Sequence, residues 1–274
     1  MQNLNQDIEN HYLREKLYED IISRLMEQNI DLNKVQRSDI AGADEFHVRG
    51  AEVSRELANC INLKGLSVLD VGCGLGGPCR MLADEYNCQT IGIDLSHEYI
   101  RTARELSKLV DLDDKTSFIQ GDATSLPFDD ESFDVIWTQH VQMNIPDKDK
   151  LYSEISRVLK SGGHFLYYDI FKVGIGEVTY PMPWASTPDM SFLFKETEMD
   201  ALLTEHGLTR LQSNDQTQSG VDFFNDLAAK MEKFGSPKIG LNVLMGESTK
   251  SKLMNLLAHL ERGVLELKSG VYIN

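Results

Sequence analysis

The chain has 274 residues, with 27 lysines and arginines against 43 aspartates and glutamates, which gives a formal net charge of −16. This acidic balance argues against binding to a nucleic-acid backbone or to an anionic membrane, because both partners need a basic surface. The length fits one large domain, or one domain with an elaborated lid.

Signals for targeting and for metal binding are weak. Residues 1–16 are polar and charged, without the apolar segment of a secretory signal, and no apolar run approaches membrane-spanning length. The cysteines form no C-x-x-C pair and have no metal-ligand spacing; they are Cys60, Cys73, Cys79 and Cys88. We therefore expect a cytoplasmic protein with reduced cysteines, no bound metal and no membrane insertion.

The N-terminal part is expected to be helical. Leu13, Leu17, Ile21 and Leu25 lie four residues apart, which places them on one face of a helix. Residues 29–44 are polar and are interpreted as a connection. A second helix is expected over residues 51–62. Residues 1–62 would together form a helical cap.

Short apolar strands then alternate with helices over residues 63–170. The expected strands cover residues 66–71, 90–94, 116–120, 133–138 and 164–170. Ser96 is placed to cap the helix after the second strand. This alternation predicts a parallel sheet with helices on both faces, and a ligand crevice beyond the carboxyl ends of the strands.

The remaining residues, 171–274, are expected to supply a substrate loop, lid helices and the last strands. The loop covers residues 172–191 and is rich in glycine and proline. Helices are expected over residues 195–206, 221–234 and 248–262, and strands over 208–212 and 265–273. The predicted fold is therefore α/β and Rossmann-like, a doubly wound, mostly parallel seven-stranded sheet with N-terminal helices and a helical lid.

The most informative segment is residues 68–77, with the sequence V-L-D-V-G-C-G-L-G-G. Its glycines allow the backbone to approach an adenosine-type ligand closely. The run is also close to a dinucleotide fingerprint, with Gly77 as the third glycine, so an NAD-dependent oxidoreductase is an alternative. Asp70 would repel a pyrophosphate but attract an ammonium or sulfonium group. That contrast favours S-adenosylmethionine, which carries both cations and no phosphate.

Several segments in order resemble class I S-adenosylmethionine-dependent methyltransferases, namely residues 68–77, 92–96, 121–123, 133–137 and 159–163. The resemblance covers about residues 60 to 170. Residues 44–50 and 74–78 are similar to the sarcosine/dimethylglycine methyltransferase-like group, which is related to phosphoethanolamine methyltransferases.

The resemblance implies contacts to the methionine part of the cofactor. Asp70 would hold the ammonium, and Gly50 would approach the carboxylate. The amides around Gly72, Gly74 and Gly76 would pack against the cofactor.

It also implies contacts to the nucleoside part. Asp94 would accept hydrogen bonds from both ribose hydroxyls, and Leu95 would pack on the adenine face. Asp122 and Ala123 would meet the adenine edge. The alternatives are that Asp94 only starts the next helix and that Asp122 is a turn residue.

Gln139 and His140, just past the fourth strand, would line the floor where the methyl group is delivered. His140 is the leading candidate for a general base, and the alternative is that it only holds this loop. Tyr12 is a second catalytic candidate, with packing on an amphipathic helix as its alternative.

The acceptor is the least constrained part of the prediction. Some amine-methylating relatives carry a histidine near this position, whereas this chain has Asn144 there and so departs from that pattern. Tyr180 and Trp184 are predicted to form an aromatic wall that binds a cation or stacks on a ring, and a rigid surface loop is the alternative. With Asn144 and His140 they make up the expected substrate site.

The predicted function is methyl transfer from S-adenosylmethionine to a small molecule, with a sarcosine- or dimethylglycine-like amine as the acceptor that the subgroup resemblance implies. O- or C-methylation of an aromatic or isoprenoid metabolite is the alternative. An NAD-dependent oxidoreductase and a non-catalytic S-adenosylmethionine-binding protein are the further alternatives.

Overall fold

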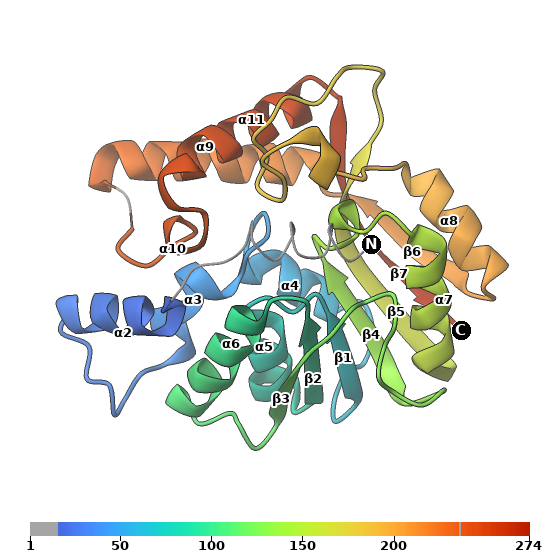
Figure 1. Ribbon diagram of the computed structural model, residues 1–274, viewed down its shortest axis with the longest axis horizontal. Coiled ribbons are helices and arrows are strands. Elements are labelled where there is room, and N and C mark those ends of the chain that lie inside the picture. Colours follow the sequence, from blue (N-terminus) through green and yellow to red (C-terminus); the bar gives the residue numbers. More distant parts are fainter. Residues whose placement is uncertain (1–15, 236) are drawn as a thin grey trace.

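The computed structural model describes residues 16–235 and 237–274 (Figure 1). Its centre is a seven-stranded sheet in the order β3-β2-β1-β4-β5-β7-β6, in which β7 runs antiparallel to its neighbours β5 and β6 and the other pairs are parallel. The expected mostly parallel, seven-stranded sheet is confirmed. The strands are β1 Ser67–Val71, β2 Gln89–Asp94, β3 Thr116–Gln120, β4 Phe133–Gln139, β5 Leu159–Lys172, β6 Thr209–Asp215 and β7 Leu265–Ile273.

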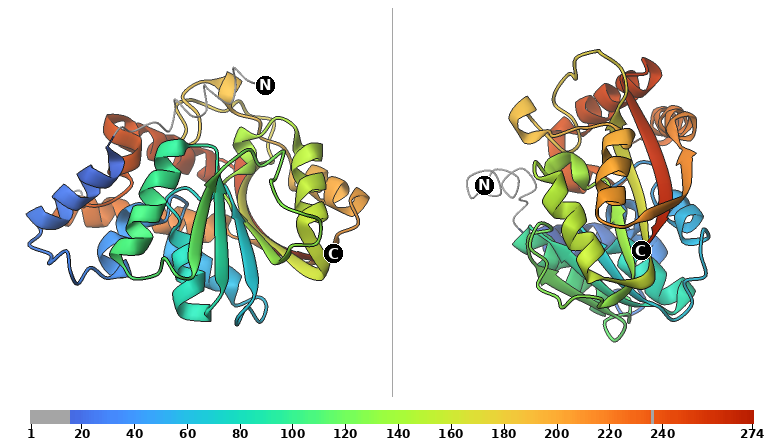
Figure 2. Two further views of the ribbon diagram at one scale, coloured as in Figure 1. Left: turned by 60° about the horizontal axis from the view of Figure 1, so that its bottom comes forward. Right: turned by 90° about the vertical axis from the view of Figure 1, so that its right-hand side faces the viewer.

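Helices surround this sheet, as Figure 2 shows from two sides. They are α2 Leu17–Glu27, α3 Arg37–Asp44, α4 Ala51–Ala58, α5 Gly77–Tyr86, α6 His97–Leu109, α7 Lys148–Val158, α8 Glu196–Glu205, α9 Thr217–Phe234, α10 Asn242–Met245 and α11 Thr249–Glu261. Three 3-10 turns complete the described elements: η1 Gln142–Asn144, η2 Pro188–Met190 and η3 Gly246–Ser248. Ser96 caps α6 as expected, because its Oγ accepts a hydrogen bond from the Tyr99 amide at 3.3 Å.

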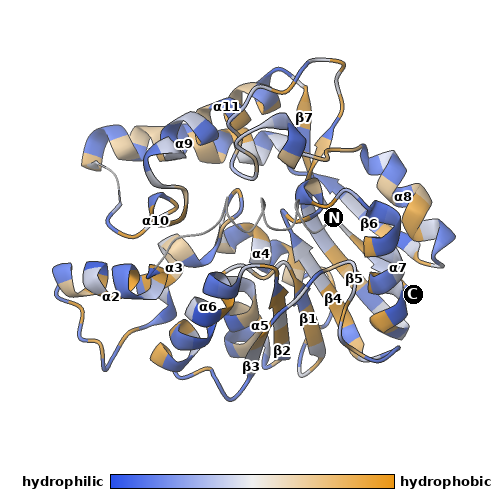
Figure 3. Ribbon diagram, viewed as in Figure 1, coloured by the Kyte–Doolittle hydropathy of each residue, from blue (hydrophilic) through white to orange (hydrophobic). Residues whose placement is uncertain are grey.

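Alternating residues of the central strands pack into two cores on opposite faces of the sheet. In β1, Val68 belongs to the core that also contains residues of α4 and α5, whereas Leu69 belongs to the core with residues of α7 and α8. The same alternation separates Val135 from Ile136 in β4. Successive side chains of a strand point to opposite faces, so a sheet covered on both sides reads as a continuous apolar run. Figure 3 shows these hydrophobic strands.

Several expected boundaries differ in the structure, and two of the differences are the largest. Residues 37–44, interpreted as part of a polar connection, form α3, whose Ile40 and Ala43 are buried. The fifth strand begins at Leu159 rather than at residue 164, because α7 ends at Val158 and Leu159 already pairs with Phe133.

The C-terminal helices α9 and α11 pack together across the end of the sheet at which β1, β2 and β4 finish (Figure 1). The loop after β5 packs on α11: the Thr179 amide donates a hydrogen bond to His259 Nε2 at 3.0 Å, and Asn255 Nδ2 donates to the Pro181 carbonyl at 2.9 Å. Over residues 16–235 and 237–274, none of the helices combines the length and apolarity needed to cross a bilayer.

Candidate active site

A cavity opens at the carboxyl ends of the parallel strands. Its walls come from residues 72–75 after β1, 93–96 at the end of β2, 121–124 after β3 and 139–141 after β4. The strand order changes direction between β1 and β4, which is where open α/β sheets bind ligands. The cavity, called the first cavity below, therefore lies where the alternation of strands and helices predicts it.

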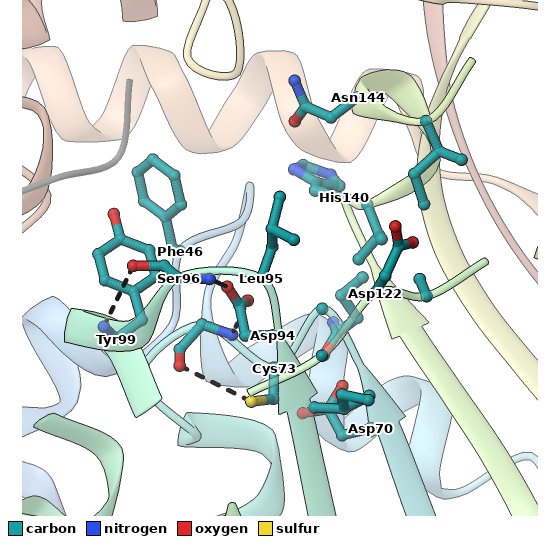
Figure 4. Close-up of a pocket in the computed structure, with 18 of the residues that line it drawn as sticks. Phe46, Asp70, Cys73, Asp94, Leu95, Ser96, Tyr99, Asp122, His140 and Asn144 are labelled. Atoms are coloured by element: carbon teal, nitrogen blue, oxygen red, sulfur yellow. Dashed lines mark hydrogen bonds between the residues drawn. The ribbon is translucent and has the colours of Figure 1, made fainter. Parts of the chain in front are cut away.

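Most of the residues expected at a cofactor site line this first cavity. They are Asp70, Gly72, Gly74, Asp94, Leu95, Asp122, Ala123 and Gln139. Figure 4 shows Asp70, Asp94 and Asp122 around it, with His140 and Asn144 on the side nearer to α9. Gly50 and Gly76 are not among the residues that line it.

Asp70 is a buried carboxyl group, 2% exposed, in the wall of the first cavity. Burial raises its pKa to about 7; a hydrogen bond from the Cys79 thiol at 3.4 Å opposes this shift, and the charges of Glu45 and Asp94 add to it. Within the described residues, no lysine or arginine side chain forms an ion pair with Asp70. A buried carboxylate of this kind is stabilised by a cationic ligand group.

Asp94 holds the glycine loop after β1. Its Oδ2 accepts a hydrogen bond from the Gly74 amide and its Oδ1 one from the Ser96 amide, both at 2.9 Å. Burial raises the pKa of Asp94, and these amide hydrogen bonds oppose that shift. Each carboxylate oxygen keeps capacity for a second hydrogen bond, so Asp94 can also accept ligand hydroxyls.

The glycines of this loop serve two purposes. Gly74 has φ +52°, and a Cβ there would meet nothing within 4 Å, so the space in front of it is open to a ligand. A Cβ on Gly72 would lie 2.4 Å from Val141 Cγ2, and one on Gly76 would lie 2.4 Å from Phe118 Cε1. These two glycines permit close packing inside the protein.

The end of β4 brings polar side chains to the same cavity. Gln139 Oε1 accepts a hydrogen bond from Trp137 Nε1 at 2.8 Å and lies 3.2 Å from Ser54 Oγ. The His140 ring lies 4.9 Å from the Tyr168 ring, and burial, together with the neighbouring His47, lowers its pKa well below the usual range. Among the described residues, three buried polar atoms here have no hydrogen-bond partner: Gln139 Nε2, His140 Nε2 and Tyr168 Oη. Such atoms are expected where a ligand completes the hydrogen bonding.

The expected substrate residues divide between two places. Asn144 lines the first cavity, and its Nδ2 donates hydrogen bonds to the carbonyls of Trp184 at 2.8 Å and Met190 at 3.2 Å. The Trp184 side chain is 1% exposed, and its Nε1 donates to Ser191 Oγ at 2.9 Å. Tyr180 packs against the hydrophobic core that contains Trp184. Neither aromatic ring lines the first cavity, and Tyr12 lies outside the described residues.

Two aromatic residues that sequence reasoning did not select also line the first cavity. Phe46 and Tyr99 lie beside each other on the opposite side of Asp94 from His140 (Figure 4). Tyr99 follows the cap residue Ser96 by three positions, so its place one turn into α6 was a usable signal. Phe46 lies in the segment that resembles the sarcosine/dimethylglycine group, but no periodicity marks it.

A second cavity of about 870 Å³ lies against α9 and α11. Its walls are largely apolar, with Phe223, Phe224, Leu227, Met231, Leu253 and Leu257 among them. Residues 41–50 and 237–242 provide further walls, including Glu45 and Gly50. His47 lines both cavities, so the two cavities border the same side chain.

Comparison with known proteins agrees with this geometry. Residues 69–167 match the methyltransferase domain family. The sterol 24-C-methyltransferase ERG6B of Gibberella zeae is 39% identical over 114 residues, which are 41% of this chain and 30% of that protein. The chloroplastic tocopherol O-methyltransferase of Arabidopsis thaliana is 36% identical over 138 residues, 49% of this chain and 39% of that protein. The matched segments thus span less than half the length of these relatives.

The fold has solved counterparts. A candidate sarcosine dimethylglycine methyltransferase from Galdieria sulphuraria superposes with a TM-score of 0.69 at 22% identity, covering 81% of this chain and 85% of that one. At this identity the likeness concerns the fold alone.

Fold, cavity and family match define the class of the domain: residues 69–167 form a methyltransferase domain of the class I S-adenosylmethionine-dependent type. The resemblance found in the glycine run is confirmed, and the family match decides against the oxidoreductase alternative. The cofactor of the class is S-adenosylmethionine. Asp70, which is buried and has no cationic partner within residues 16–235 and 237–274, and the open space before Gly74 fit a ligand that carries an ammonium group and a nucleoside.

Proposed function

We propose that the chain transfers a methyl group from S-adenosylmethionine to a carbon or oxygen atom of a small, largely apolar molecule of isoprenoid or isoprenoid-substituted aromatic type. The observation that carries this proposal is the large apolar second cavity, which adjoins the first cavity at His47.

The first cavity would hold the cofactor. Asp70 would pair with the methionine ammonium, Asp94 would accept the ribose hydroxyls, and Leu95 would pack on the adenine, with Asp122 and Ala123 at its edge. When bound, S-adenosylmethionine supplies a methyl carbon that its sulfonium has already activated. The protein's task is then to align the acceptor and to exclude water.

The second cavity would hold the acceptor. Burying apolar surface contributes about 25 cal/mol per Å², so walls such as Phe224 and Leu257 favour a hydrocarbon-rich ligand. A sarcosine-like acceptor exposes a carboxylate and an amine, whose burial needs polar partners. The names of the sterol and tocopherol relatives point in the same direction. We therefore place C- or O-methylation first and the amine acceptor second.

The test is mass-spectrometric detection of a deuterated methyl group transferred from labelled S-adenosylmethionine. The acceptors are a sterol with an unsaturated side chain, an isoprenoid-substituted phenol, sarcosine, dimethylglycine and phosphoethanolamine. We expect a labelled apolar product together with S-adenosylhomocysteine. Labelling of the amines alone would overturn the choice of acceptor, and no labelling of any acceptor would overturn the proposed activity on them.

A further inference from the structure

We propose that Glu45 and His47 form the proton-accepting pair of the methyl transfer, with His47 Nδ1 as the atom that takes the proton from the acceptor. The inference rests on the proposed function, because it requires cofactor and acceptor to meet where His47 lines both cavities.

Hydrogen bonding around His47 fixes which ring nitrogen carries a proton. Nε2 lies 3.1 Å from Glu45 Oε2, 3.1 Å from the Gly50 carbonyl oxygen and 3.0 Å from Ser54 Oγ. The Ser54 hydroxyl can donate its own proton to Glu45 Oε2, 2.9 Å away. A carboxylate and a carbonyl accept hydrogen bonds and cannot donate them, so Nε2 carries the proton. The lone pair of the neutral ring is then on Nδ1.

His47 Nδ1 is available to act on a ligand. Over residues 16–235 and 237–274, the hydrogen bonds of this ring all involve Nε2. The side chain is 6% exposed, so it is shielded from bulk water while it lines the two cavities. A group that is held at one nitrogen and has its lone pair on the other has the arrangement that general-base catalysis needs.

Glu45 supports the charge that would form on His47. It is 6% exposed, and although burial acts to raise its pKa, hydrogen bonds from His47 and Ser54 keep the pKa below its usual value. The pair therefore contains a carboxylate that orients the ring and stabilises an imidazolium. His140 and Tyr168 face the pair, with rings 6.1 and 6.2 Å from that of His47. The Glu45 charge also acts on the carboxyl groups of Asp70 and Asp44, whose pKa values it raises, and it interacts with the charges of Arg37 and Arg55.

His140, the base candidate from the sequence, is less suited to accept a proton. Burial and the nearby His47 lower its pKa well below the usual range, which keeps the ring neutral. Its unpartnered Nε2 can still hydrogen-bond a ligand. We infer that His140 helps to position the acceptor and that His47 takes the proton.

The step balances as follows for a hydroxyl acceptor. The oxygen forms a bond to the methyl carbon, the bond from that carbon to sulfur breaks, and the electron pair of the broken bond stays on sulfur as a thioether. The O–H proton goes to the lone pair of His47 Nδ1, which leaves an imidazolium beside the Glu45 carboxylate. For a carbon acceptor, the proton is the one lost from the methylated carbon or its neighbour.

The first measurement needs no turnover. Nitrogen-15 NMR of the histidines in the free protein is expected to show His47 protonated at Nε2 when neutral, and the Nε2 resonance of His47 is expected to move in Glu45→Gln, because this nitrogen lies 3.1 Å from Glu45 Oε2. His206→Gln, far from the cavities and paired with Asp149, is the matched control. A neutral His47 protonated at Nδ1 would overturn the proposal.

The second measurement uses His47→Gln, whose amide nitrogen can replace Nε2 as donor to Glu45 but offers no basic lone pair. We expect kcat to fall about 100-fold or more, the acidic limb of its pH profile to disappear, and the dissociation constant of S-adenosylmethionine to stay within about twofold. Unchanged kcat, or loss of cofactor binding in both this variant and Glu45→Gln, would overturn the proposal. Both variants are assayed with whichever acceptor the wild-type protein methylates, so a wrong acceptor class and a wrong proton acceptor give different results.

Discussion

Two acidic residues of the first cavity, Asp70 and Asp94, have buried carboxyl groups that form no ion pair with a described lysine or arginine. Asp70 is almost fully buried, and Asp94 uses both carboxylate oxygens to hold backbone amides. Keeping a carboxyl group in such a place costs free energy unless a ligand interacts with it. The two residues therefore give the sharpest tests of cofactor binding.

The pH dependence of binding tests Asp70. Its pKa is raised to about 7 in the free protein, so below that pH the carboxyl group is neutral and must lose a proton to pair with an ammonium. The affinity for S-adenosylmethionine is therefore expected to weaken as the pH falls below about 7, by up to about tenfold per pH unit. Calorimetric titration over a range from about pH 5.5 to about pH 8, which brackets the raised pKa of Asp70, measures this change in affinity.

Asp70→Asn is the matched variant, because its neutral amide has nearly the same shape. We expect weaker binding at pH 8 and loss of this pH dependence. A variant that binds like the wild type over the whole range would remove Asp70 from the cofactor site.

Asp94 tests the nucleoside end of the cavity. Asp94→Ala is expected to weaken binding of S-adenosylmethionine by about 1.5–3 kcal/mol, the value of hydrogen bonds to a charged group. Asp94→Asn keeps one acceptor oxygen for the loop amides and should lose less. Equal affinity of all three proteins, measured by calorimetry, would refute the ribose assignment.

At the scale of elements, α3 is tied to α5 by one buried ion pair. Arg80 on α5 is fully buried and bonds to Asp44 at the end of α3 through its Nη2, which also bonds the Leu75 carbonyl of the glycine loop. Its Nη1 donates to the Ala103 carbonyl and to Ser107 Oγ, both at 3.1 Å. One guanidinium thus joins α3, the loop and α6.

Removing that guanidinium should be costly. Arg80→Met leaves the Asp44 carboxylate buried without a partner, and we expect the free energy of unfolding to fall by about 3–5 kcal/mol. Urea unfolding measures the change. The double variant Arg80→Met with Asp44→Leu removes both charges and is expected to recover part of the loss. A single variant as stable as the wild type would show that the pair is not needed.

These elements also show what the sequence can and cannot predict. β3 and β7 begin and end where they were expected, because a short strand bounded by turn residues is a local pattern. The eight-residue helix α3 was missed because only Ile40, Ala43 and Asp44 of it are buried and its contacts come from distant segments. The Arg80 ion pair and the approach of Gly42 to the Ile239 carbonyl have no local signal.

The residues of the candidate site also divide into those that the sequence predicts and those that it does not. Asp70 and Asp94 lie at the carboxyl ends of β1 and β2, and Asp122 comes two residues after β3, so parallel pairing alone brings them together. The second cavity has walls from residues 41–50, α9 and α11, which are far apart in the chain. His47 gains its place only when these segments meet, and no spacing rule connects them.

For the whole molecule, the central feature is the junction of two cavities of different character. The first lies mainly in the methyltransferase domain, and the second is walled mainly by α9 and α11, which lie between β6 and β7 in the chain. In the proposed arrangement, this division would let the wall of the acceptor cavity change without disturbing the wall of the cofactor cavity.

Filling the second cavity should separate the two functions. Ala228 of α9 lines it, and Ala228→Trp is expected to raise KM for the apolar acceptor while leaving the affinity for S-adenosylmethionine unchanged. Ala229→Trp is the matched control, since Ala229 is exposed on the same helix and is not part of the cavity wall. Steady-state kinetics of both variants measure the KM for the acceptor. Equal KM values for Ala228→Trp and Ala229→Trp would place the acceptor outside the second cavity.

The most direct measurement is a crystal structure of the protein with S-adenosylhomocysteine and the methylated product. We expect the ammonium of S-adenosylhomocysteine to lie against Asp70 and the product to fill the cavity under α9 and α11, with its new methyl group beside His47. A product bound outside the second cavity, or a cofactor product away from Asp70 and Asp94, would contradict it.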